Sequence, residues 1–107
     1  DTVAGVAGFL LLLPPRYFRS FHLSHHRHTQ VPARDPELVG KNVSTFGRYL
    51  IYASGMLYWR DGILILIRHA MGQVTASYIG RTASQPIVNE ARCYLCIYKC
   101  IILCLCI

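Results

Sequence analysis

Two apolar runs, one at each end of the chain, constrain the fold of this sequence most strongly. Residues 3–13 and 93–107 contain a single charged side chain between them, Lys99. With 53% hydrophobic and 15% charged residues, the chain is too apolar for an ordinary soluble domain. Each run is shorter than the roughly 20 residues that cross a bilayer. We therefore predict truncated transmembrane helices over 3–13 and 93–107, the alternative being buried core helices of a soluble protein.

The segment between the runs, residues 16–92, carries most of the charge. It holds ten of the eleven Lys and Arg residues but only four of the five acidic residues. By the positive-inside bias, we expect this segment to lie at the cytoplasmic face of a membrane. A nucleic acid partner, which a net charge of +6 also permits, is discounted because the basic residues are scattered singly among apolar ones.

Proline and glycine positions divide the middle segment into helices, and we expect an all-α protein. Pro14 and Pro15 stop the first helix or open the next one, which is predicted over residues 16–29. Pro32 and Pro36 then make a turn. The further expected elements are an interfacial helix over 43–57, an amphipathic helix over 62–74, a loop over 77–85 and a last helix beginning near 86–90.

Three histidines on the predicted helix 16–29 point to a metal site. At about 100° per residue, His25 lies roughly 60° to one side of His22 and His26 roughly 40° to the other, so the three share one face. Neutral imidazole is a good ligand for iron, zinc and copper. His28 falls too far round the helix to converge with His26. The alternative is a solvated polar patch that binds lipid headgroups when it is protonated.

The residues around these histidines resemble the second histidine box of the membrane fatty acid desaturases, which reads H-x-x-H-H. The likeness covers residues 17–30 and the following Pro-Ala-Arg-Asp-Pro-Glu-Leu of residues 32–38. The segments 55–60 and 87–92 also look like bacterial-type members of that family. The resemblance therefore extends over most of the chain and makes 1–107 a partial desaturase domain.

This resemblance implies an integral membrane, oxygen-dependent oxidoreductase that removes hydrogens from, or hydroxylates, a lipid acyl chain in lipid metabolism. It implies a non-haem di-iron centre, dioxygen as co-substrate and an external electron donor of the ferredoxin or cytochrome type. His22, His25 and His26 match the second box as metal ligands, on the cytoplasmic side. The family's first and third boxes have no counterpart here, so we expect an internal or truncated piece that is inactive alone.

Two carboxylates follow the histidine helix. Asp35 is expected either to cap the next element or to hydrogen-bond to a ligand histidine and fix its tautomer. Because Asp35 and Glu37 flank Pro36, we expect both in an extended turn exposed to water, which argues against a pair of catalytic carboxylates. We assign no catalytic residue beyond the metal ligands.

Two other groups of potential ligands are given no role. His69 is expected to be an interfacial polar group. The five cysteines all lie in the last apolar run, and four recur at spacings of three and four. That spacing favours a helix-packing face or chance composition over a metal site, and palmitoylation at Cys93 stays open. The cysteines of the run are Cys93, Cys96, Cys100, Cys104 and Cys106.

Other function classes stay open or are excluded by missing motifs. The sequence lacks the G-x-S-x-G motif of hydrolases, the P-loop of phosphate-binding proteins and the G-x-G-x-x-G motif of dinucleotide-binding proteins. These three function classes are therefore excluded. Two alternatives to the enzyme remain: a non-catalytic small membrane protein, and a membrane module that binds a transition metal. Within the enzyme class, desaturase, hydroxylase and ketolase share the same box.

Overall fold

The computed structural model describes residues 2–38 and 44–106, and all regular secondary structure in these residues is helical. The expected all-α class is confirmed. The helices within the described residues are α1 Thr2–Leu10, α2 Pro15–His28, α3 Phe46–Ala53, α4 Met56–Ala70 and α5 Arg81–Leu105.

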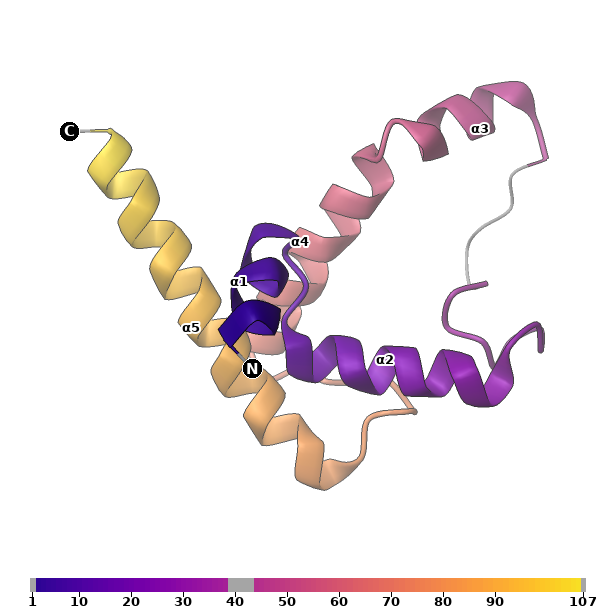
Figure 1. Ribbon diagram of the computed structural model, residues 1–107, viewed down its shortest axis with the longest axis horizontal. Helices are drawn as coiled ribbons and strands as arrows, with labels where there is room; N and C mark the ends of the chain where they lie inside the picture. The colour runs from indigo at the N-terminus through magenta and orange to yellow at the C-terminus, as the bar shows by residue number, and fades with distance from the viewer. Residues whose placement is uncertain (1, 39–43, 107) are drawn as a thin grey trace.

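The C-terminal half of α4 packs against the middle of α5, and this crossing forms the core (Figure 1). Leu66 of α4 meets Ala91 and Tyr94 of α5, and all three side chains are buried. Because Ala91 has only a methyl group, the two helix backbones approach closely at this point. From the crossing, α5 and the α4–α3 arm extend in diverging directions.

The short apolar helix α1 lies beside this crossing and is held mainly by tyrosines of α5 (Figure 1). The ring of Phe9 stacks on that of Tyr98, with ring centroids 4.3 Å apart. The Tyr94 hydroxyl donates to the Gly5 carbonyl at 3.0 Å, and the Tyr98 hydroxyl donates to the Phe9 carbonyl. These contacts join residues that are far apart in the sequence, so α1 is part of the tertiary core.

Two prolines separate α1 from α2, as predicted. The Leu13 N–H donates to the Gly8 carbonyl at 2.7 Å and closes the end of α1. Pro15 is the first residue of α2, where its missing N–H leaves no hydrogen bond unmade. The next N–H, that of Arg16, donates to a carboxylate oxygen of Glu90 on α5 at 3.0 Å. The start of α2 is thereby fixed to α5.

The segment from α3 to α4 differs from the expectation of separate helices over 43–57 and 62–74. Gly55 adopts a φ of +71°, a left-handed conformation that favours glycine, and α4 begins directly after it at Met56. The helical break therefore falls at Ser54 and Gly55, and α4 continues through Gly62. Val43, the first residue of the expected helix, lies outside the described residues.

The predicted start of the last helix near 86–90 is wrong, because α5 begins at Arg81 and runs through Pro86. A proline inside a helix removes the hydrogen bond to the carbonyl four residues earlier, here that of Thr82. Near the N-terminus this affects only the first turns, and the rest of the helix continues. The Ser84 hydroxyl also donates to the Arg81 carbonyl at 2.8 Å within this first part.

No single helix among residues 2–38 and 44–106 is both long and apolar enough to cross a bilayer. Helices α3 and α4 meet that requirement together, by length and composition, as a pair bent by 57°. Helices do form in both predicted terminal runs, at α1 and in the second half of α5. Their membrane insertion stays a prediction.

The cysteine side chains do not form the helix-packing face that their spacing favoured. All five are exposed and free. The buried face of α5 instead carries Ile87, Val88, Ala91 and Tyr94, which lie before or between the first cysteines. The core at the α4–α5 crossing is therefore built from the first half of α5.

We expect Gly8→Ala to lower the free energy of unfolding by about 1–3 kcal/mol, the usual cost of overpacking. A methyl group at Gly8 would lie 2.5 Å from the Leu13 carbonyl oxygen and 2.9 Å from Cδ of Pro15. Gly5→Ala is the matched control, because nothing lies within 4 Å of its added methyl group. Chemical denaturation in detergent, followed by circular dichroism, measures both variants. Equal stability of the two variants would contradict this packing of α1 against Pro15.

Candidate metal centre

All three predicted ligands lie on one helix, α2 Pro15–His28, whose bounds agree with the predicted 16–29 to within one residue. The last turn of α2 contains His25, His26, Arg27 and His28, and α2 has no acidic residue in its first turn. Carbonyl groups at a helix C-terminus carry partial negative charge and favour a cation nearby. The histidines therefore sit where the backbone itself favours positive charge.

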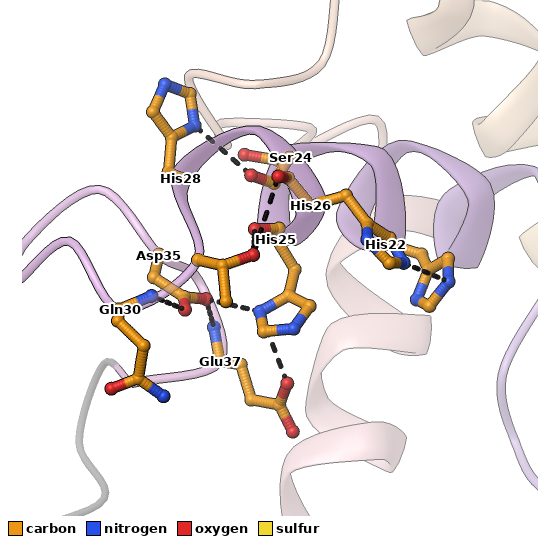
Figure 2. Close-up of polar contacts among 9 residues, drawn as sticks. His22, Ser24, His25, His26, His28, Gln30, Asp35 and Glu37 are labelled. Carbon is orange, nitrogen blue, oxygen red and sulfur yellow. Dashed lines mark hydrogen bonds and ion pairs between the residues drawn. The ribbon is translucent and has the colours of Figure 1, made fainter.

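His22 and His26 form a close pair on the exposed side of α2 (Figure 2). Their Nε2 atoms are 3.0 Å apart and their rings are nearly perpendicular, at 84°. Two metal–nitrogen bonds of about 2.1 Å at a right angle place the two nitrogens about 3 Å apart. The ring of Phe18 stacks on that of His22, with centroids 5.2 Å apart. The two Nε2 atoms form a hydrogen bond with each other, so one of them carries a proton, which must move to Nδ1 before both atoms can bind one cation.

His25 takes a different orientation, toward the turn that follows α2 (Figure 2). Its Nδ1 lies 2.8 Å from Oδ1 of Asp35 and 3.3 Å from Oε2 of Glu37. Its ring centroid is 5.7 Å from that of His26 and 6.5 Å from that of His22. Among the described residues, no three side chains of the ligand types His, Cys, Asp and Glu converge as a metal-binding group. The structure thus gathers the predicted trio on one face but converges only two of its rings.

Asp35 is fully buried, so the expectation of a water-exposed carboxylate in an extended turn is wrong. Gln30 and Ala33 both adopt left-handed φ angles, of 64° and 66°, which fold the chain back against α2. The Asp35 carboxylate then accepts hydrogen bonds from the backbone N–H groups of Gln30 and Glu37, at 3.1 and 2.9 Å. It closes this turn and holds His25 at the same time.

The charge of Asp35 is stabilised by these donors. Burial of the carboxyl group raises its pKa, but hydrogen bonds from His25 and from the two backbone N–H groups outweigh that effect and hold the pKa below its ordinary value. Asp35 is therefore ionised at neutral pH, and its carboxylate accepts a hydrogen bond from an N–H group of His25. In neutral His25 this puts the proton on Nδ1 and leaves the lone pair of Nε2 for a ligand.

His28 is directed away from the other histidines, as its position on the helix predicted. Its Nδ1 lies 3.1 Å from the Ser24 carbonyl oxygen of the preceding turn, which engages it with the backbone (Figure 2). His28 shares the last turn of α2 with His25 and His26 but not their contacts. It serves below as a matched control for the ligand histidines.

His69 is buried rather than interfacial, which corrects the expectation for this residue. Only 5% of it is exposed, and its ring makes an edge contact with that of Tyr17, with centroids 4.8 Å apart. Its Nδ1 has no hydrogen-bond partner among the described residues. His69 follows the buried Leu66 by three positions, so the helical spacing of α4 was the signal that indicated burial. His69 therefore joins α4 to α2 through its contact with Tyr17.

A helix with three histidines on one face, one of them oriented by a buried carboxylate, defines a candidate histidine-ligated metal protein. The sequence model of the fatty acid desaturase family matches residues 1–106, and this chain belongs to that family. Full-length members of the family are oxidoreductases, generally dependent on non-haem iron. The searches of curated proteins and of solved structures gave no match.

The residues present fit an iron ion in donor chemistry. Imidazole nitrogens suit iron, and a carboxylate behind a ligating histidine is the usual support for such a ligand. His22 and His26 offer a pair of Nε2 atoms, and His25 offers a third whose tautomer Asp35 sets. These three imidazole nitrogens are too few to complete the coordination of even one of two iron ions. The donor types of these side chains therefore suit iron, although no three ligand side chains converge among the described residues.

We expect His25 to be protonated at Nδ1 when neutral, because the ionised Asp35 accepts a hydrogen bond from that nitrogen. Nitrogen-15 NMR of the imidazole rings distinguishes the two neutral tautomers. The double variant Asp35→Ala with Glu37→Ala removes both carboxylate acceptors near Nδ1 and shifts His25 toward the Nε2–H form, which free imidazole favours. Asp61→Ala, a change at an exposed aspartate paired with Arg60, is the control and leaves the spectrum of His25 unchanged. A wild-type His25 that is protonated at Nε2 would contradict the assignment.

Proposed function

We propose that this chain is part of a desaturase-like, oxygen-dependent oxidoreductase that acts on lipid acyl chains, with His22, His25 and His26 as iron ligands. The observation that carries the proposal is the hydrogen bond between the buried Asp35 and Nδ1 of His25, one helical turn from the His22–His26 pair. A carboxylate in this position both orients a ligand ring and raises its basicity. A solvated patch of histidines that only binds lipid headgroups does not require a buried carboxylate behind one of its rings.

Each residue has a distinct part in this proposal. His22 and His26 would hold iron through their paired Nε2 atoms, and His25 would add its Nε2. Asp35 keeps the proton on Nδ1 of His25 and, through the backbone N–H groups of Gln30 and Glu37, fixes the turn that supports the ring. Iron, when bound, supplies the reduction of dioxygen that the removal of hydrogen from an acyl chain requires.

Two irons need more ligands than three imidazoles. We therefore propose that the remaining ligands of a di-iron centre come from beyond the described residues. The electrons that reduce dioxygen come from an external donor of the ferredoxin or cytochrome type. The chain by itself then binds metal weakly and has no turnover.

Exposed apolar side chains support contact with a membrane, the environment of a lipid substrate. Large hydrophobic residues are exposed on α3 and along the second half of α5, including Leu50, Ile51, Ile101, Ile102 and Leu103. Exposed apolar surface of this extent marks an interaction site in soluble and membrane proteins alike. We propose that lipid covers these surfaces. We also propose that the histidines face the cytoplasm, because the segment that contains them is basic and basic segments tend to stay on the cytoplasmic side.

The ligand assignment is tested by anaerobic titration of the detergent-solubilised chain with Fe(II), followed by calorimetry. We expect weak binding by the wild type, and a loss of more than about tenfold in affinity for His26→Ala, because one of the two paired Nε2 atoms is removed. His28→Ala is the matched control from the same helical turn and keeps the wild-type affinity. Equal affinities for the two variants would contradict the assignment. A preference for zinc or copper over Fe(II) is expected of any imidazole site, so only tight binding of zinc or copper by the chain alone would instead favour a metal-binding module without oxygen chemistry.

The partial nature of the centre is tested by product analysis. The chain is supplied with iron, a chemical reductant, dioxygen and acyl lipid, and the acyl chains are analysed by mass spectrometry. We expect no desaturated or hydroxylated product, because three histidines do not complete two iron sites. A full-length member of the fatty acid desaturase family, assayed in parallel, is the positive control. Clear product formation by the chain alone would contradict the proposal that further ligands are required.

A further inference from the structure

A groove between α2 and α5 lies apart from the metal ligands and has the chemistry of an anion site. It has a volume of about 450 Å³, is open to solvent and is lined on the α2 side by Arg16, Arg19 and Ser20. Thr82 and Ala83, in the first turn of α5, line the opposite side. Two arginines of α2 and a threonine of α5 thus line one groove, together with the apolar residues Leu23, Pro86 and Ile87.

The two arginines differ in how far their charge is already neutralised. Arg16 is engaged with Glu90, since its backbone N–H donates to Oε2 at 3.0 Å and its Nε lies 4.0 Å from Oε1. Arg19 is exposed and makes neither a hydrogen bond nor an ion pair with any described residue. A guanidinium group binds phosphate oxygens through two parallel hydrogen bonds. Arg19 therefore carries the uncompensated charge of this groove.

The start of α5 adds to the positive potential. Gly80 precedes the helix, and no side chain caps the N–H groups of its first turn, which also lacks an acidic residue. Uncapped N–H groups at the start of a long helix favour an anion. Because Thr82 and Ala83 line the groove, this helix end and the arginines act on the same space.

A second, more apolar cavity adjoins the first. It has a volume of about 550 Å³ and shares Arg16 and Pro86 with the first groove. It continues along α5 past Asn89, Glu90, Cys93 and Tyr94, with Gly5 of α1 on the other side. On α2 it reaches only Arg16, at the end of the helix opposite to the histidines. A groove that carries two arginines and continues into a more apolar one suits an amphipathic anion, with its head at Arg19 and its tail beside α1 and α5.

We propose that this pair of cavities binds an anionic phospholipid, with the phosphate held by Arg19, Arg16 and the start of α5 and an acyl tail lying in the apolar cavity. Because the apolar cavity leads away from His22 and His26, this lipid is a bound lipid that bridges α1, α2 and α5 rather than the reacting substrate. The site requires no iron, so it stands or fails independently of the proposed oxidoreductase function.

Binding is measured by calorimetry with the 107-residue chain in a neutral detergent, without metal, using short-chain phosphatidylglycerol as the probe. Two further ligands separate the sources of affinity: inorganic phosphate and short-chain diacylglycerol. We expect phosphatidylglycerol to bind at least about tenfold more tightly than either, because only it offers both head and tail. The proposal would be overturned if the affinity for inorganic phosphate, or the affinity for diacylglycerol, equalled that for phosphatidylglycerol.

Variants then locate the site. Arg19→Gln is expected to weaken phosphatidylglycerol binding about tenfold, through the loss of charge-assisted hydrogen bonds. Arg27→Gln makes the same charge change on the same helix but outside the groove, and is expected to change affinity by less than about twofold. Thr82→Val tests the α5 side, with a weakening of about threefold for a lost neutral hydrogen bond. Helical circular dichroism confirms that each variant is folded. Equal weakening by Arg19→Gln and Arg27→Gln would overturn the proposal in favour of general charge attraction.

Discussion

The close contact of α4 and α5 at Leu66 and Ala91 holds α1 and α2 in place. Ala91 is small and completely buried, so the backbones approach closely, and the guanidinium Nε of Arg92 donates to the Ala70 carbonyl at 2.8 Å beside it. The tyrosines of α5 then attach α1 to this crossing. α2 is attached to both helices of the crossing, through Arg16 to Glu90 on α5 and through Tyr17 to His69 on α4. The position of the histidine helix therefore follows from a core that contains none of the predicted ligands.

Opposite ends of α2 have opposite chemical character. Its first half presents Arg16 and Arg19 beside the uncapped start of α5, which favours an anion. Its last turn carries the histidines, with the negative end of the helix dipole and the buried Asp35 close by, which favours a cation. A single polar helix thus separates a groove proposed for a lipid phosphate from a proposed metal centre. The groove and the proposed metal centre lie at different ends of α2 because the helix spans 14 residues.

Much of the candidate site could be predicted from the sequence, because helical periodicity alone sets which side chains share a face. The i, i+3 and i+4 spacing predicted that His22, His25 and His26 share one face of α2 and that His28 lies apart. The structure pairs His22 with His26, turns His25 toward Asp35 and directs His28 to the Ser24 carbonyl. Pro14 and Pro15 likewise determined where one helix ends and the next begins. Where long-range contacts decide, two predictions were wrong: α5 begins at Arg81 and not near Pro86, and His69 is buried.

The sequence by itself determined the helical class, the helix that carries the histidines and the likeness to the fatty acid desaturases, because these depend on local spacing and on motif. The sequence offered a hydrogen bond from a ligand histidine to Asp35 as one of two alternatives. The tertiary structure decided for it and buried Asp35, since two left-handed residues, Gln30 and Ala33, fold the turn back onto α2. It also decided that Arg19 faces the start of α5, residues 81–83, across an open groove. Backbone reversal and helix packing bring these groups together over long stretches of chain, and no local pattern of residues encodes that approach.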